Sequence, residues 1–406
     1  MSRIAKPLHL PALIIVIAAL TYTAALCFAN TNVTSVSNGL IAIVDGAIVL
    51  GALALTMRAP RRGLWIILLA LAVNFLLIAL LADEFNLKAV RDPLVLLAFV
   101  ALGQRYGGQR MAARAFVIAA AIVVPIAVIE LAAPALYTQF FDVLRYYQGR
   151  GLVSAEQAQF QTSSFFVSGE RSDGRFLTAF FGSHRASSIF LEPVSMGNFG
   201  AIVAAFALSL DPRRWRLAVG LGAVAIFSIV AADARFAAIV LVLFVLARFL
   251  PSAWTNFVLA PLPLVSVAIL LAMSAAISET GDTFATRLSL SGRMLGELEF
   301  EQLLGLAPYS ATAVDSGYAY ALISFGLPTC ILLWAAFVAV PAQTKEAARY
   351  KLMLGLYACA LLCISGSSLF ALKTAALGWF AFGALTGLQA AARRAPARQK
   401  MQAAPA

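Results

Sequence analysis

About twelve apolar segments separated by short polar turns limit how this chain can fold more than any other feature. A helix needs about 20 apolar residues to cross the hydrocarbon core of a bilayer. We therefore expect an all-α, polytopic integral membrane protein with about twelve transmembrane helices. The predicted spans are 11–29, 39–57, 63–82, 86–103, 115–136, 189–210, 217–232, 236–250, 256–277, 317–340, 352–370 and 374–391.

The charge content agrees with this class, because only 12% of the residues are charged, whereas soluble domains carry about a quarter. The net charge of +11 comes mainly from basic residues in the turns, where they set membrane topology. No basic run carries interleaved aromatic residues, so we expect no nucleic-acid partner. The four cysteines lie in apolar segments without disulfide or metal-binding spacing, and we expect no cofactor and no metal.

The positive-inside rule predicts that the N-terminus is cytoplasmic, because the turns that would then face inward carry most of the basic residues. An even number of spans brings the basic tail that begins at Arg393 to the same side. Arg3 and Lys6 precede the span 11–29, and the residues after it do not resemble a cleavage site. We therefore expect this span to be retained as the first transmembrane helix.

Two long polar segments are predicted to face outward, and connections of this length usually carry function. In the first, Ser154 and Gln157 form a capping box that predicts a short helix. In the second, Met294, Leu295 and Leu298 can share one face of an amphipathic surface helix. The predicted organisation is helices 1–5 (1–136), first loop (137–188), helices 6–9 (189–277), second loop (278–316), helices 10–12 (317–392) and a disordered cytoplasmic tail (393–406).

Charge is concentrated in three stretches at the predicted outer side, 185–198, 233–235 and 287–318. Arg185 and Glu192 lie at the edge of an apolar span, where charge is costly unless it is paired or binds a ligand. We expect the three stretches to face one another across a single cavity.

The outer cations favour an anionic ligand, because arginine binds phosphate in a bidentate manner. Three local ion pairs are the competing explanation: Arg185 with Glu192, Arg235 with Asp233, and Arg293 with Glu297. The cations concerned are Arg145, Arg150, Arg171, Arg175, Arg185, Arg235, Arg287, Arg293 and Lys373.

Two carboxylates are candidates for a general base, Glu192 first and Asp315 second. Burial beside Phe190 would raise the pKa of Glu192, and Arg185 would lower it. Asp315 is equally well explained as the N-cap of the helix that follows it. No nucleotide-binding glycine pattern is present, so an enzyme of this kind would act outside, without ATP.

Three stretches resemble motifs of the Wzy-type polysaccharide polymerases and the related O-antigen ligases, and are most similar to those of exopolysaccharide polymerases of the xanthan type. The first is similar to the family pattern Arg-x-x-(small)-x-Phe-x-(Glu or His)-Pro-x-x-x-Gly, and the second to a Ser-Arg-(small) segment that opens a helix. The third is similar to an arginine-containing loop that leads into a helix. They are RASSIFLEPVSMGNF (185–199), AADARFAAIVLVLFVL (231–246), and GRMLGELEFEQLLGLAPYS (292–310) with DSGYAYALISFGLPTCILLW (315–334).

The resemblance implies a GT-C-like, metal-independent, inverting glycosyltransferase of the bacterial inner membrane. Its donor would be an undecaprenyl-pyrophosphate-linked oligosaccharide, and its acceptor the sugar end of a second lipid-linked unit. By position, Arg185, Arg235 and Arg293 would hold the pyrophosphate, with Arg287 and Tyr318 as further substrate-binding residues. Glu192 or Asp315 would activate the acceptor hydroxyl. Ligases carry a histidine where this chain has Asp315 to Tyr318, and this departure favours a polymerase.

The alternatives are transfer to another acceptor by a ligase, a flippase of lipid-linked glycans, and a structural subunit of an export complex. A flippase would place charge along a central path, with internal repeats and broken helices at mid-membrane. Membrane lipids, a chain-length regulator and export proteins are the other expected partners. Aromatic pairs in the first loop, such as Tyr146 with Tyr147, either stack on sugars or form an interfacial belt.

Overall fold

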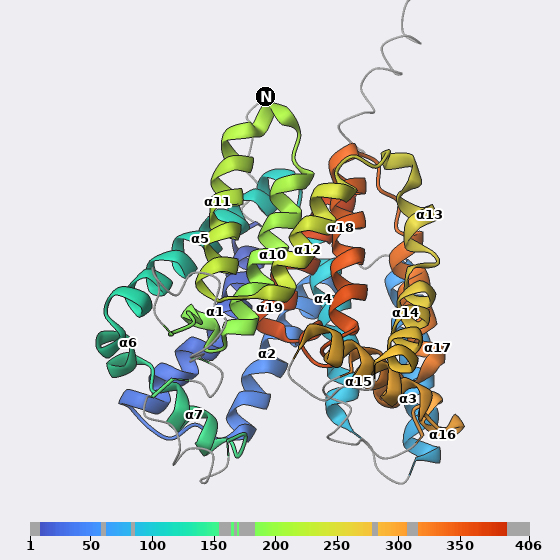
Figure 1. Cartoon of the computed structure of the whole chain (residues 1–406), viewed down its shortest axis with the longest axis horizontal. Helices are drawn as coiled ribbons and strands as arrows, with labels where there is room; N and C mark the ends of the chain where they lie inside the picture. The colour runs from blue at the N-terminus through green and yellow to red at the C-terminus, as the bar shows by residue number, and fades with distance from the viewer. Residues whose placement is uncertain are drawn as a thin grey trace, which may run out of the picture.

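The computed structural model describes residues 9–57, 62–82, 86–153, 164–165, 169, 183–277, 283–306 and 316–387. Within these ranges the chain is all-helical, without β-strands (Figure 1). The helices are α1 (His9–Asn32), α2 (Asn38–Met57), α3 (Arg62–Leu81), α4 (Leu87–Tyr106), α5 (Gln109–Ala132), α6 (Pro134–Phe140), α7 (Val143–Gly149), α10 (Pro193–Ser209), α11 (Trp215–Ala231), α12 (Arg235–Ala247), α13 (Thr255–Leu259), α14 (Leu262–Ala276), α15 (Phe284–Gly296), α16 (Phe300–Leu303), α17 (Gly317–Ala339), α18 (Lys345–Leu362) and α19 (Leu372–Thr386); η1 (Ser188–Phe190), η2 (Pro212–Arg214) and η3 (Ser252–Trp254) are single 3₁₀ turns.

By length and composition, six of the described helices could cross a membrane, or seven if α12 and the segment Ser252–Leu259 form one span bent by 118°. Helices α10 and α14 are apolar but shorter. A helix lies in each of the twelve predicted segments, so the helical membrane class agrees with the sequence, whereas a count of twelve spans is not confirmed.

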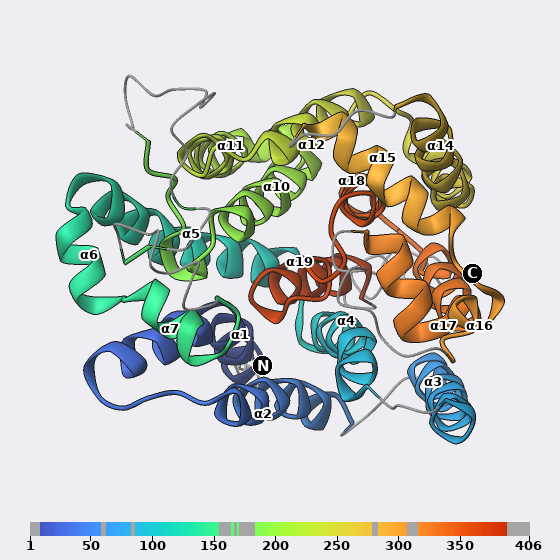
Figure 2. The ribbon, with the colours of Figure 1, turned by 60° about the horizontal axis from the view of Figure 1, so that its bottom comes forward.

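Helices α4, α10 and α19 form the tightly packed centre of the bundle. Figure 2 shows α19 near its middle, in contact with α1, α4, α5, α10 and α18. Helices α4 and α19 approach so closely that a Cβ on Gly383 would collide with the carbonyl oxygen of Val100, and one on Gly103 with that of Phe380. Small residues permit this approach, which favours helix association in lipid.

Helices α3, α14, α15, α16 and α17 lie on the opposite side of the molecule from α6 and α7 (Figures 1 and 2). Helix α17 is broken at Gly326, whose φ of 73° suits glycine, and Pro328 follows in the same turn. The side-chain amide of Asn74 on α3 donates to Phe325 O (3.2 Å) and Thr329 Oγ1 (2.8 Å) at this break. These bonds attach α3 to α17.

The first predicted loop is partly helical, because α6 and α7 occupy its beginning. The short helix predicted from Ser154 and Gln157 lies outside the described residues. Tyr146 and Tyr147 are buried in a satellite core, so neither expected role for this pair, an interfacial belt or a sugar-stacking surface, fits their burial.

The second predicted loop does contain a helix, and the face that it packs against the protein is not the one formed by Met294 and Leu295. Helix α15 begins after a capping box of Thr283 with Thr286 and ends at Gly296, so Leu298 lies beyond it. The face packed against α14 and α17 consists of small and polar residues, because a close approach leaves no room for Met294 or Leu295: a Cβ on Gly292 would collide with Leu270 O. The buried residues of α15 are Thr286, Ser289, Ser291 and Gly292.

Candidate functional site

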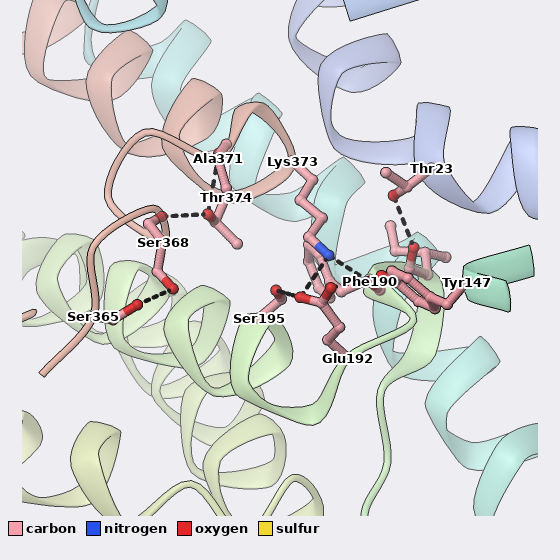
Figure 3. A network of polar contacts seen from close by, with 11 residues as sticks. Thr23, Tyr147, Phe190, Glu192, Ser195, Ser365, Ser368, Ala371, Lys373 and Thr374 are labelled. Carbon is pink, nitrogen blue, oxygen red and sulfur yellow. Dashed lines mark hydrogen bonds and ion pairs between the residues drawn. The ribbon is translucent and has the colours of Figure 1, made fainter. Parts of the chain in front are cut away.

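The segment Arg185–Glu192, which we call the junction, forms hydrogen bonds with several helices that are far apart in the sequence. Its backbone is bonded to α1, α6, α11 and α19, in part as Figure 3 shows. These contacts fix the direction in which its side chains point. The bonds run from Ala186 N to Ala231 O (2.9 Å), from Tyr137 Oη to Ser188 O (2.8 Å), from Thr23 Oγ1 to Ile189 O (3.5 Å) and from Lys373 Nζ to Phe190 O (2.8 Å).

Glu130 of α5 anchors the other end of the junction. Its carboxylate is fully buried and accepts bonds from the backbone N–H groups of Ser187 (2.9 Å) and Ser188 (2.6 Å), and from the Ser187 hydroxyl (2.8 Å). His184 Nε2 lies 3.1 Å from the same carboxylate. Buried carboxylates are stable only when they are bonded in this way, so Glu130 is a structural clamp.

Two left-handed residues give the junction its shape. Ser188 has φ of 50° and Leu191 has φ of 63°, a conformation that disfavours residues with a side chain. The chain reverses between η1 and α10, and Pro193 then takes the first helical position, where its missing N–H is harmless. Such strain persists only where the surroundings hold it, here through the bonds just described.

Glu192 is held by three donors from three helices (Figure 3). Tyr147 of α7 donates to Oε1 (2.6 Å), while Ser195 of α10 and Lys373 of α19 donate to Oε2 (2.9 Å each). The Glu192 side chain is 29% exposed and that of Lys373 9%. The ion pair therefore lies at the edge of the packed interior, with part of the Glu192 side chain accessible.

Glu192 precedes the first residue of α10 and is ionised at neutral pH. Burial alone would raise its pKa, but the Lys373 ammonium and the bonds from Tyr147, Lys373 and Ser195 outweigh that effect, so the pKa lies below its ordinary value. The sequence suggested Arg185 as the partner, and that was wrong: Lys373 pairs with Glu192 instead.

Arg185 points to the turn between α11 and α12. Its Nε donates to Ala232 O (3.0 Å), beside Asp233, which is buried with φ of 46°, and Arg235, which opens α12. Gly197 of α10 packs against Ala234 in the same turn. The first two charged stretches are thus brought together, as the sequence predicted.

The third charged stretch packs elsewhere. Arg287 and Arg293 are exposed on α15, which packs mainly on α14 and α17. Arg293 Nη2 lies 3.5 Å from Ser289 Oγ, and in the described part of the chain Arg293 forms no ion pair with Glu297. The structure therefore brings the first two charged stretches together, whereas the third lies on another part of the bundle.

Asp315 lies outside the described residues. Ser316, not Asp315, caps α17, because its Oγ accepts from Ala319 N (3.4 Å). Tyr318 is 8% exposed and lines an apolar cavity between helices, described below. It is not part of an exposed polar surface.

A polar cluster that the sequence did not single out lies at the start of α4. Arg91 binds Asp45 (2.8 Å) and Asp92 (2.6 Å), and Tyr320 Oη donates to Asp92. The Lys88 ammonium lies 4.8 Å from the centre of the Tyr320 ring. The sequence feature that could have predicted this cluster is the group of charged residues in the first turns of the predicted span 86–103. Charge inside a membrane is rarely without a partner or a function.

Among the described residues, no group of three or more histidine, cysteine, aspartate or glutamate side chains is arranged to hold a metal. The four cysteines are free. Compared with known proteins, the chain matches no family model, no curated protein and no solved structure. Chemically, the arrangement offers an ionised carboxylate beside Lys373, on a side chain that is partly accessible.

Proposed function

We propose that this protein is a glycosyltransferase that polymerises polyprenyl-pyrophosphate-linked oligosaccharide units on the outer side of a bacterial inner membrane. The motif resemblance suggests this reaction, and the position of Glu192 supports it. The proposal includes twelve spans, with both termini in the cytoplasm.

The observation that carries the proposal is the setting of Glu192. A general base needs a carboxylate that is ionised, fixed in direction and open to the substrate. Lys373, Tyr147 and Ser195 supply the first two conditions, and the 29% exposure of the side chain supplies the third.

In the proposed reaction, Glu192 accepts the proton of an acceptor sugar hydroxyl as the oxygen attacks the anomeric carbon of the donor. The new glycosidic C–O bond forms while the bond from that carbon to the diphosphate oxygen breaks. The electron pair leaves with the lipid diphosphate, whose growing charge nearby cations would stabilise. Arg185, which donates to Ala232 O in the α11–α12 turn, and Arg235, which begins α12, are proposed for that task.

Arg287, Arg293 and Tyr318 remain proposed substrate contacts from the resemblance alone, and Asp315 remains the second candidate base. A chain-length regulator and export proteins remain the proposed partners of the polymerase.

A transporter of lipid-linked glycans is the second candidate, and a specific observation favours it. Helix α17 is broken at Gly326 near its middle, and α12 is bent sharply from the following helical segment. Broken helices at mid-membrane are common in transporters. The break in α17 is, however, lined by apolar residues such as Phe325 and Leu327, not by charge.

The test is to delete the gene and restore it with Glu192→Gln, Lys373→Met or Arg185→Ala. We expect each variant to abolish long polymer while single lipid-linked units accumulate on the outer side. Arg216→Ala, at an exposed position on α11, is the matched control and should support normal polymer. Units trapped on the cytoplasmic side would favour the transporter, and normal polymer from all three variants would remove the site assignment.

A further inference from the structure

A large apolar cavity lies between α3, α4, α14, α17, α18 and α19 and is not part of the junction. Its volume is about 1430 Å³, whereas pockets for drug-sized ligands measure about 300–1,000 Å³. Its walls are almost entirely hydrocarbon, with Leu97, Phe325 and Trp334 among them. A ligand that fills it must therefore be long and apolar.

The cavity extends along the bundle for roughly the depth of a bilayer. Its α17 wall runs from Tyr318 to Val340. A straight helix of that length would cover about 33 Å at 1.5 Å per residue, and the break at Gly326 shortens it, so the wall is comparable with the hydrocarbon core of a membrane, about 30 Å. Leu264, Leu327 and Ile331 line the cavity and are also exposed on the outside of the bundle. A hydrocarbon chain could therefore enter sideways from the membrane.

Polar lining is concentrated at one end, where α4 finishes. Gln104 and Arg105 lie in the last turn of α4, and Asn256 lies in α13. The Asn256 side-chain oxygen accepts a bond from the buried Lys351 ammonium (2.8 Å), which adds positive charge behind it. At the opposite end the polar lining groups are the Tyr318 hydroxyl and the neighbouring Cys359 thiol.

We propose that this cavity binds one phospholipid with an anionic head group. The acyl chains lie along the apolar walls, and the phosphate lies beside Arg105 and Gln104. The charge of Arg105 and Lys351 selects an anionic over a zwitterionic head group. The sequence predicts that this end faces the cytoplasm, where anionic lipids attract basic residues. The inference is independent of the proposed glycosyl transfer.

Native mass spectrometry of the full chain in detergent tests this site with added phosphatidylglycerol or phosphatidylethanolamine. We expect phosphatidylglycerol to be retained about tenfold more, as one bond to a charged group would give. Arg105→Gln should remove that preference. Arg216→Gln is the matched control, because both guanidinium groups lie over an aromatic ring, Tyr106 at 5.4 Å and Trp215 at 5.6 Å.

A second pair of variants tests the apolar part of the site. Ala335→Trp places a large ring in the cavity and should abolish retention of both lipids, whereas Ala223→Trp, exposed on α11, should not. If Ala335→Trp does not purify as a folded protein, Leu97→Trp on the α4 wall replaces it. Undiminished lipid retention in the filled cavity, or an unchanged preference in Arg105→Gln, would overturn the proposal.

Discussion

The junction and the apolar cavity are built by opposite means. At the junction, Glu130 and Lys373 place directional hydrogen bonds on one short segment. Around the cavity, α3 is attached to α17 by the amide of Asn74 and otherwise by apolar contact. Directional bonds fix a geometry to within tenths of an ångström, whereas apolar walls accept a chain of variable shape. The first suits chemistry and the second suits lipid.

Among the variants that test this comparison, removal of the Glu130 carboxylate should have the largest effect on the free energy of unfolding. Glu130→Ala leaves three buried donors of Ser187 and Ser188 without an acceptor, which should lower the free energy of unfolding by about 3–5 kcal/mol. Thermal unfolding in detergent measures this loss. Glu297→Ala, at an exposed position, should change stability by less than about 0.5 kcal/mol, and an equal response of the two variants would contradict the clamp.

Loss of Lys373 should have the next largest effect. Lys373→Met keeps the apolar stem but leaves Glu192 without its cation. Breaking a buried pair removes about 3–5 kcal/mol, and the partial exposure of Glu192 reduces this to about 2–3 kcal/mol. A double-mutant cycle with Glu192→Gln should recover most of that energy as coupling. A coupling near zero would show that the pair contributes nothing.

The same pair predicts a pH dependence. The folded pKa of Glu192 is lowered, so its stabilisation is complete above its ordinary value of 4.5 and is lost as the pH falls through the lower folded value. Without Lys373 that pKa should rise. The stability gap between the wild type and Lys373→Met should therefore shrink below about pH 4.5, and a gap that widened on acidification would rule out this linkage.

A smaller loss is expected where α4 meets α19. Gly383→Ala forces a Cβ against Val100 O, and overpacking of about 1–3 kcal/mol less the helix gain of alanine leaves a loss of about 1–2 kcal/mol. Gly222→Ala on α11 meets nothing within 4 Å and should be neutral or slightly stabilising. Unfolding curves of the two variants that coincide would mean that the helices are not in close contact.

The smallest loss of stability should come from a substitution in the helices around the cavity. Asn74→Leu removes two hydrogen bonds to α17, which should cost about 1 kcal/mol. Hydrogen exchange should become faster in α3 but not in α10. If α10 responded as strongly, the two regions would not be independent, and the contrast between them would fail.

The helices were predictable because a bilayer demands long apolar runs, and a run of that length can be read directly from the sequence. Their ends were less predictable. Helix α18 begins at Lys345, seven residues before the predicted span 352–370, because the Thr344 hydroxyl caps it. A capping residue accepts hydrogen bonds from the first backbone N–H groups of a helix even where the sequence is charged. Hydropathy therefore does not show where such a helix begins.

The site was predictable only in part. The position of Arg185 and Glu192 at the edge of a span indicated their importance, because charge there is costly. The partner of Glu192 was not predictable, since Lys373 lies 181 residues away and only the packing of α19 against α10 brings it close. The cavity has no sequence signature, because it is space that helices leave between them.

The contact between α4 and α19 has a consequence for movement. Backbone meets backbone at Gly103 and Gly383 with no side chain between them, so neither helix can slide without the other. Lys373 lies in the first turn of α19, and Arg91 lies in the first turns of α4. A displacement of Lys373 when a ligand enters would therefore shift Arg91 and its two aspartates as well, so that two polar clusters without a direct bond between them would respond together.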